Sequence, residues 1–179
     1  MDMTGERRIS ASRKVVWAAL NDVAVLKQCI PGCELLEKQS DTDMVARATL
    51  QIGPVKATFN GKVRLSDLDP PNGYRISGDG SGGVAGYAKG SAVVRLADDG
   101  RDTLMKYEVK ADVGGKLAQL GGRLIDSAAK RLADEFFEKF TAIVGAASAQ
   151  AGASATAPVK RKGWFSRLLG RKDKVAAAS

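Results

Sequence analysis

The feature that most constrains this chain is a segment, residues 114–146, whose apolar residues recur at steps of three and four. The spacing predicts one long helix with a single apolar stripe, formed by Leu117, Leu120, Leu124, Ala128, Leu132, Phe136, Phe140 and Val144. A helix that is apolar on one side needs an extended apolar surface to pack against. Because the segments before it are patterned as strands, we expect that surface to be a sheet.

The strand pattern is clearest on either side of Gly53 and Pro54, where apolar and polar residues alternate from residue 44 to residue 65. Such alternation predicts two strands with one buried face, joined by a turn. The same alternation over residues 86–96 and 104–113 predicts a later hairpin. Upstream, residues 3–10 are expected to form a first strand. Two short helices should follow, one capped by Ser12 and one running from about Val23 to Cys29.

The sequence therefore predicts an α+β fold in which a curved antiparallel sheet of about seven strands wraps around a long C-terminal helix. Gly121 and Gly122 fall inside the predicted helix, where each costs about 1 kcal/mol relative to alanine. Two explanations remain open: close contact between helix and sheet, or space left for a ligand. If a cavity exists, we expect it to be lined by Phe59, Val63, Tyr87, Met105, Tyr107, Leu117, Leu120, Gly121 and Leu124.

The sequence gives little indication of a catalytic or metal-binding site. The chain has no histidine, which removes the commonest general base and the commonest zinc ligand. Its two cysteines, Cys29 and Cys33, are separated by three residues and have no second ligand pair. We interpret them as reduced cysteines flanking a turn, with a metal or redox role as the alternative. An enzyme would have to rely on carboxylates such as Asp112 or Asp126.

A glycine-rich stretch contains Gly78, Gly80 and Gly83, spaced as in the dinucleotide-binding fingerprint. That fingerprint requires a helix after the glycines, whereas a strand pattern follows here. We therefore expect a flexible hairpin that acts as a lid over the cavity mouth. Tyr87 and Lys89 beside it face either a ligand head group or solvent.

The positive charge is concentrated at the C-terminal end. Of the net charge of +8, residues 146–179 carry +6. Residues 146–159 are small and lack an apolar stripe, which predicts a flexible tether. Residues 160–179 predict a short amphipathic helix that lies in a membrane interface. Its binding residues would be Lys160, Arg161, Lys162, Trp164, Phe165, Arg167, Leu168, Leu169, Arg171 and Lys172. The alternatives are an acidic protein partner and, less favoured, nucleic acid.

Several motifs together resemble the family of the carbon monoxide dehydrogenase G-subunit (CoxG), within the START-like helix-grip superfamily. They occur in order at residues 30–34 (IPGCE), 52–57 (IGPVKA), 61–65 (GKVRL), 69–71 (DPP), 78–90 (GDGSGGVAGYAKG) and 115–126 (GKLAQLGGRLID). The resemblance covers about residues 1–145. It implies a non-catalytic accessory protein of molybdenum hydroxylases, notably aerobic carbon monoxide dehydrogenase. Such a protein would attach the enzyme to the membrane and help electrons reach the quinone pool.

These observations give two hypotheses. In the first, residues 1–145 form a helix-grip carrier of an apolar isoprenoid ligand, a quinone of the menaquinone or ubiquinone type. The tether and tail would hold it at the cytoplasmic face of the inner membrane. In the second, the domain is a ligand-free adaptor that anchors the dehydrogenase there. Both expect a cytoplasmic protein that is peripherally attached to the membrane and does not bind nucleic acid.

Overall fold

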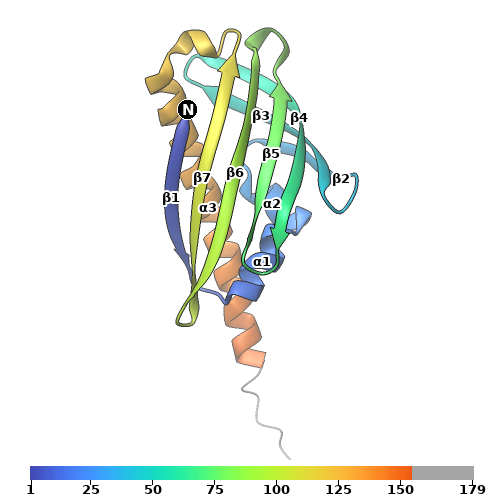
Figure 1. Cartoon of the computed structure of the whole chain (residues 1–179), viewed down its shortest axis with the longest axis vertical. Helices are drawn as coiled ribbons and strands as arrows, with labels where there is room; N and C mark the ends of the chain where they lie inside the picture. Colours follow the sequence, from blue (N-terminus) through green and yellow to red (C-terminus); the bar gives the residue numbers. More distant parts are fainter. Residues whose placement is uncertain (155–179) are drawn as a thin grey trace, which may run out of the picture.

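The computed structural model describes residues 1–154, which form one curved sheet, one long helix and two short helices (Figure 1). The elements follow in the order β1 (Asp2–Ile9), α1 (Arg13–Leu20), α2 (Val23–Cys29), β2 (Cys33–Lys38), β3 (Asp43–Ile52), β4 (Val55–Asp69), β5 (Gly73–Ser81), the 3₁₀ turn η1 (Gly83–Ala85), β6 (Tyr87–Asp99), β7 (Asp102–Gly114), the 3₁₀ turn η2 (Ala118–Leu120) and α3 (Gly122–Ser154). The predicted helix-grip fold is confirmed.

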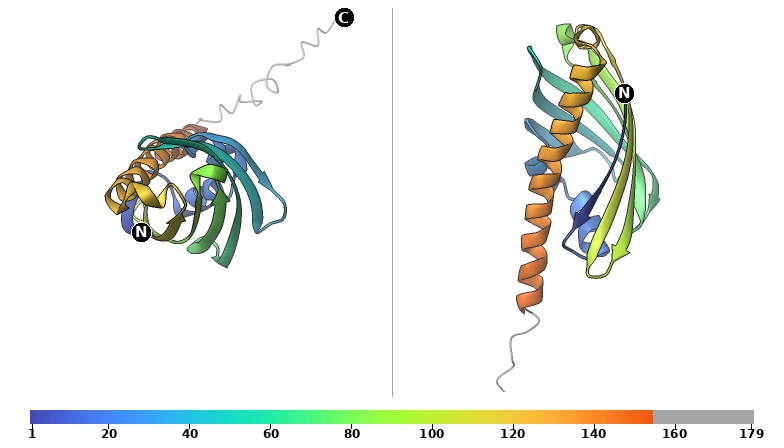
Figure 2. Two further views of the ribbon diagram at one scale, coloured as in Figure 1. Left: turned by 90° about the horizontal axis from the view of Figure 1, so that it is seen from above. Right: turned by 90° about the vertical axis from the view of Figure 1, so that its left-hand side faces the viewer.

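The sheet has seven strands in the order β1-β7-β6-β5-β4-β3-β2, and every neighbouring pair is antiparallel. The alternation in the sequence matches its two faces. In β4, Val63 and Leu65 face inward, whereas Lys62 and Arg64 are exposed. Helix α3 lies along the inner face and contacts both β1 and β3, close to the two edges of the sheet (Figure 2).

The two ends of the molecule differ in what they carry. One end, here called the hairpin end, carries the β3–β4 turn, the β5–β6 connection and the start of α3 (Figure 1). The opposite end carries the β4–β5 and β6–β7 turns, and α3 ends beyond it. With 33 residues, α3 is about 50 Å long at 1.5 Å per residue. Within residues 1–154, no helix combines the length and apolar character needed to cross a bilayer.

The long helix starts later than the sequence predicts. Residues 115–121 form a turn and the single 3₁₀ turn η2, and α3 starts at Gly122. Gly115 and Gly121 have φ angles of +71° and +84°, so neither has helical geometry. Gly121 therefore lies before the helix and Gly122 is its first residue, so the predicted helix-interior cost does not arise. Leu117 and Leu120 fit the helical spacing but lie before the helix.

The helix also ends later than predicted. We expected a tether from residue 146, but α3 continues to Ser154. Residues 146–154 are mostly alanine, the residue with the highest helix propensity, and the helix already formed can extend through them. The remaining tether residues, 155–159, and the predicted membrane-binding tail, 160–179, lie outside the described residues.

The two short helices close the inner face at the opposite end. Both lie where the sequence places them, but their caps differ. Ser12 occupies the N-cap position of α1 without a capping hydrogen bond from its side chain. Asp22 caps α2, its carboxylate accepting from the backbone N–H of Ala24 at 2.8 Å. Trp17 on α1 packs edge-on against Tyr74, with ring centroids 5.3 Å apart.

Candidate functional site

An apolar cavity of about 340 Å³ lies between the sheet and α3 and is here called the central cavity. Its walls come from every strand of the sheet, from α1, α2 and the turn after α2, and from α3. The lining residues are all apolar or tyrosine: Met3, Leu20, Leu26, Ile30, Leu36, Met44, Ala46, Val63, Leu65, Tyr74, Ile76, Ala92, Val94, Met105, Tyr107, Val109, Ala133, Phe136 and Phe137. Within residues 1–154, no charged side chain contributes to these walls.

The cavity exists because small residues face large ones across it. On the sheet, Ala46 and Ala92 contribute only methyl groups to the lining. Towards the hairpin end the residues on the inner face are smaller still, since Gly78 pairs with Gly90 and Gly80 pairs with Ala88. On α3, Ala133 faces the cavity one turn before Phe136 and Phe137. The cavity is the space that these alanines leave and that the two rings do not fill.

Two tyrosines supply the hydroxyl groups of the lining. Tyr74 is 5% exposed, and burial raises the pKa of its phenol, so the group stays neutral at physiological pH. The ring of Tyr107 stacks on that of Phe137 with centroids 5.1 Å apart. The cavity therefore offers a ligand a large apolar surface and few hydrogen-bonding groups, which suits a hydrophobic molecule.

Three of the nine predicted lining residues, Val63, Met105 and Tyr107, line the central cavity. The other six lie nearer the hairpin end and do not line it: Phe59, Tyr87, Leu117, Leu120, Gly121 and Leu124. The cause is the same for the last four. With the helix expected to start at Gly114, Leu117, Leu120 and Leu124 fell on one stripe with Phe136 and Gly121 beside it, whereas all four lie before or at the first turn of α3. Whether any of the nine contacts a ligand stays a prediction.

The six residues outside the cavity have different surroundings. Leu117 is buried, and its backbone N–H donates to the carbonyl of Ala85 at 3.0 Å. Tyr87 is 55% exposed on the outer side of β6. Phe59 lies beside Gly82, and Leu124 lies beside Gly53 and lines a small separate pocket. Leu117 thus links the segment before α3 to the β5–β6 connection, and Leu124 links the start of α3 to the β3–β4 turn.

Sequence reasoning missed several lining residues. Phe136 was on the predicted stripe, and the adjacent Phe137 shares the same side of α3. Met3 lay in the predicted first strand, but nothing indicated that this strand bordered a cavity. The residues contributed by the α1–α2 corner depend on how that corner folds back over the sheet, and no local pattern in the sequence reports this.

The glycine stretch is not a dinucleotide site. Gly78 and Gly80 lie within β5, and after the short turn η1 the chain returns as β6, antiparallel to β5. The expected hairpin is confirmed. At its tip Val84 is 86% exposed while the neighbouring Ala85 is buried. Whether this connection moves as a lid stays a prediction.

Cysteine and metal chemistry is not supported within residues 1–154. Cys29 and Cys33 are both free thiols, and burial raises the pKa of each. Thiols with raised pKa values are poor nucleophiles and poor metal ligands at neutral pH. No group of three or more acidic or cysteine side chains in this part of the chain could hold a metal ion.

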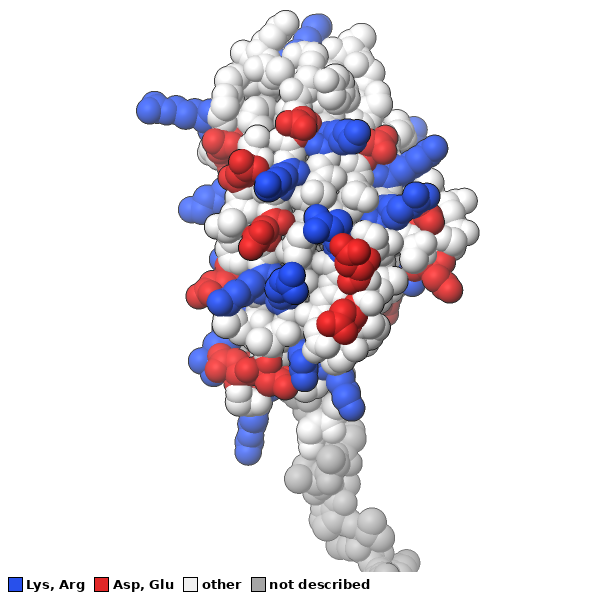
Figure 3. Space-filling model, viewed as in Figure 1, with Lys and Arg blue, Asp and Glu red and all other residues white. Residues whose placement is uncertain are grey.

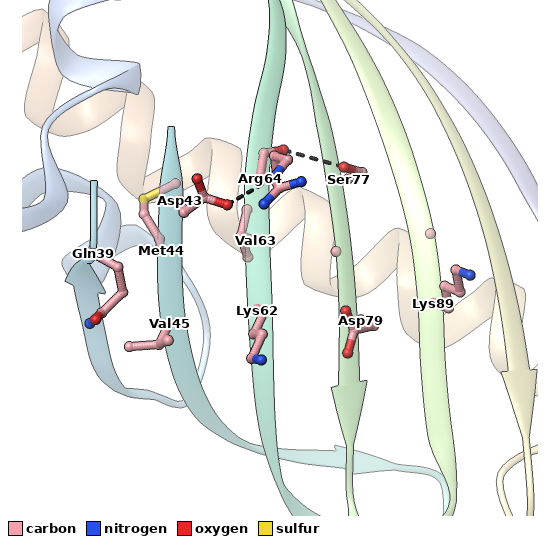
Figure 4. A pocket seen from close by; sticks show the side chains of 12 residues that line it. Gln39, Asp43, Met44, Val45, Lys62, Val63, Arg64, Ser77, Asp79 and Lys89 are labelled. Atoms are coloured by element: carbon pink, nitrogen blue, oxygen red, sulfur yellow. Dashed lines mark hydrogen bonds and ion pairs between the residues drawn. The ribbon is translucent and has the colours of Figure 1, made fainter. Parts of the chain in front are cut away.

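A larger hollow, of about 600 Å³, lies on the outer face of the sheet (Figure 4). Lys62, Asp79 and Lys89 stand on successive strands around it, and Arg64 donates to Asp43 at 2.8 Å. The hydrogen bond from Arg64 lowers the pKa of Asp43, which keeps that carboxylate charged. Figure 3 shows charges of both signs interleaved over this face. The hollow therefore does not favour ligands of one charge or polarity, and the central cavity is the better candidate for a ligand-binding site.

The chain was compared with known proteins. A family model described as the G-subunit of carbon monoxide dehydrogenase (CoxG) matches residues 5–145. No curated protein matches. A solved structure, titled a conserved protein from Geobacillus kaustophilus, is 29% identical, with 80% of this chain and 95% of that chain covered and a TM-score of 0.76.

Two further solved structures share the fold. A protein from Thermus thermophilus is 16% identical over 83% of this chain and 99% of its own, with a TM-score of 0.62. An aromatase/cyclase from a Streptomyces species is 12% identical over 80% of this chain and 93% of its own, with a TM-score of 0.56. At these identities the similarity extends to the fold alone.

Proposed function

The chain belongs to the CoxG family of carbon monoxide dehydrogenase, and from this premise we propose that it is a non-catalytic accessory protein of a molybdenum-containing carbon monoxide dehydrogenase. In this proposal it brings the enzyme to the cytoplasmic face of the inner membrane. It also carries an apolar ligand, a respiratory quinone of the menaquinone or ubiquinone type, in the central cavity. The observation that carries the proposal is the cavity itself, whose lining is apolar apart from two tyrosine hydroxyls.

The lining supports an apolar cargo on energetic grounds. Each square ångström of apolar surface removed from water contributes about 25 cal/mol, so an isoprenoid chain gains from every contact with these walls. A charged or strongly polar group in the same place would lose its hydration without compensation. The volume of about 340 Å³ is near the lower end for small-molecule sites. A long isoprenoid would therefore be enclosed only in part.

A quinone also suits the chemistry of the partner. Oxidation of carbon monoxide with water releases two electrons and two protons, and a quinone takes up both to become a quinol. The bound quinone would supply that redox chemistry, while this chain's residues would shelter it from water. Catalysis by the chain itself is not part of the proposal. Asp112 and Asp126, the carboxylates considered above, are both exposed and lie outside the central cavity.

The cargo can be identified directly. We expect organic extraction of the full chain, purified without detergent from quinone-containing cells, to yield quinone at a substantial fraction of one molecule per chain. Liquid chromatography with mass spectrometry measures it. An unrelated soluble protein of similar size, purified identically, sets the background. Quinone no higher than this background would contradict the proposed cargo.

The tail provides a separate prediction about membrane recruitment. Removing residues 160–179 should abolish sedimentation with vesicles of anionic lipid, because each basic residue near such a surface contributes about 1 kcal/mol. A variant with Trp164, Phe165, Leu168 and Leu169 replaced by alanine keeps the charge and should retain only weak, salt-sensitive binding. Undiminished sedimentation of the truncated chain would show that the tail is not the membrane contact.

A further inference from the structure

A second, more polar space lies beside the central cavity, between the edge strand β1 and helix α3, and is here called the side vestibule. It has a volume of about 320 Å³. β1 pairs only with β7, so its other edge is free of strands and runs alongside α3 (Figure 2). The residues that matter are Thr4 and Arg7 from β1, Tyr107 from β7, and Asp126, Lys130 and Asp134 from α3.

The side vestibule and the central cavity are adjacent. Met3, Tyr107 and Ala133 line both spaces. The two spaces therefore share a wall, to which Ala133 contributes only a methyl group and Met3 an unbranched side chain.

Two hydrogen-bond donors line the side vestibule without a partner among residues 1–154: the hydroxyl of the buried Tyr107 and the ammonium group of the exposed Lys130. The hydroxyl of Tyr107 lies against the backbone of Gly5, where an added Cβ would collide with it, and it takes part in no hydrogen bond there. The ammonium group of Lys130 likewise forms no ion pair within the described part of the chain. The nearby Asp134 is instead bound by Arg7, whose guanidinium also lies over the ring of Phe137 at 5.3 Å.

The charges around the side vestibule balance. Arg7, Lys130 and the amino terminus are opposed by Asp2, Asp126 and Asp134. The amino terminus already donates to the carbonyl of Ala111 at 2.9 Å. Because Arg7 pairs with Asp134, the groups left on α3 are Lys130 and, one turn before it, Asp126, whose carboxylate would repel an anionic head group. A neutral head group with acceptor oxygens meets no such repulsion.

We propose that the side vestibule is the polar subsite of the ligand-binding site. In it, the carbonyl oxygens of a neutral head group accept hydrogen bonds from Tyr107 and Lys130, while the apolar chain of the same ligand lies in the central cavity. This inference rests on the proposed carriage of an apolar ligand. It adds the ligand's orientation: head group at β1 and α3, chain against Ala92 and Met44.

The test compares two probes that share a ten-carbon chain: decylubiquinone, which has two ring carbonyls, and decylbenzene, which has none. Binding to the full chain is measured by partition from cyclodextrin followed by extraction. Tyr107→Phe removes only the hydroxyl, and Lys130→Met removes the charge while keeping the chain length. Each substitution should weaken the affinity for decylubiquinone about 3- to 10-fold, as expected for a lost hydrogen bond. Neither should change decylbenzene binding.

Lys139→Met, on the exposed side of the same helix, is the matched control and should change neither affinity. Unchanged decylubiquinone affinity in both test variants would overturn the polar subsite and leave the proposed carriage standing. Equal losses for both probes would overturn it too, because the residues would then act through cavity shape. If neither probe binds the unaltered chain, the carriage proposal fails, and the subsite with it.

Discussion

Replacing Ala133 with leucine should lower the affinity of the full chain for decylubiquinone at least tenfold while leaving the protein folded. Ala133 faces the central cavity from α3, and the larger side chain would project into the space proposed for the ligand. Leucine is a good helix former, so the helix itself is not disturbed. Filling an unoccupied apolar space typically adds about 0.5–2 kcal/mol to stability. The free energy of unfolding should therefore stay the same or rise.

Affinity by partition and unfolding by urea, followed by circular dichroism, measure the two effects separately. Ala142→Leu is the matched control, because Ala142 lies on the exposed side of the same helix. It should alter neither quantity by much. If Ala133→Leu binds the quinone as tightly as the unaltered chain, the ligand does not occupy the central cavity. If it also sustains electron transfer from the dehydrogenase to the membrane, the adaptor hypothesis becomes the better one.

The largest effect on stability is expected from Phe140→Ala. Phe140 is 0% exposed, and its ring stacks on that of Phe136 with centroids 5.6 Å apart. It belongs to the core on which α1, α2 and α3 converge rather than to the cavity lining. Truncating a buried phenylalanine costs about 3–5 kcal/mol, through lost burial and the void left behind. For a chain of this length the melting temperature should fall by about 6–20 °C.

Urea unfolding of the full chain measures the loss, and Leu124→Ala serves for comparison. Leu124 is 36% exposed at the first turn of α3, so its truncation should cost about 1 kcal/mol or less. A loss below about 1 kcal/mol for Phe140→Ala would mean that α3 is not held at this position.

Much of the fold could be predicted because it depends on local patterns. Alternation in β3 and β4 assigns Val63 and Leu65 to the inner face whatever the rest of the chain does. Pro31 and Gly32 end the second short helix by their backbone preferences alone. Dependence on local patterns also explains why the start of the long helix was wrongly predicted at Gly114. Leu117 and Leu120 satisfy the helical period, but positive φ angles at Gly115 and Gly121 break the helix, and periodicity does not detect them.

The candidate site was predicted less completely, since a cavity is a property of surfaces that meet. The sequence indicated Val63, Met105 and Tyr107 because they lie on inward faces of strands. It did not indicate Met3, Ile30 or Ala133, which come together only when an edge strand, a turn and a helix pack around one space. The side vestibule is a further case, because its donors Tyr107 and Lys130 belong to different elements.

The sequence by itself therefore determined the succession of elements, the inward face of each strand and the absence of histidine chemistry, because these depend on residues close together in the chain. The tertiary structure decided where α3 begins, which side chains surround the central cavity and which donors are left without partners beside it. Those properties depend on the curvature of the sheet and on the line that α3 follows across it. Both are set by packing between segments more than a hundred residues apart, such as Arg7 and Asp134.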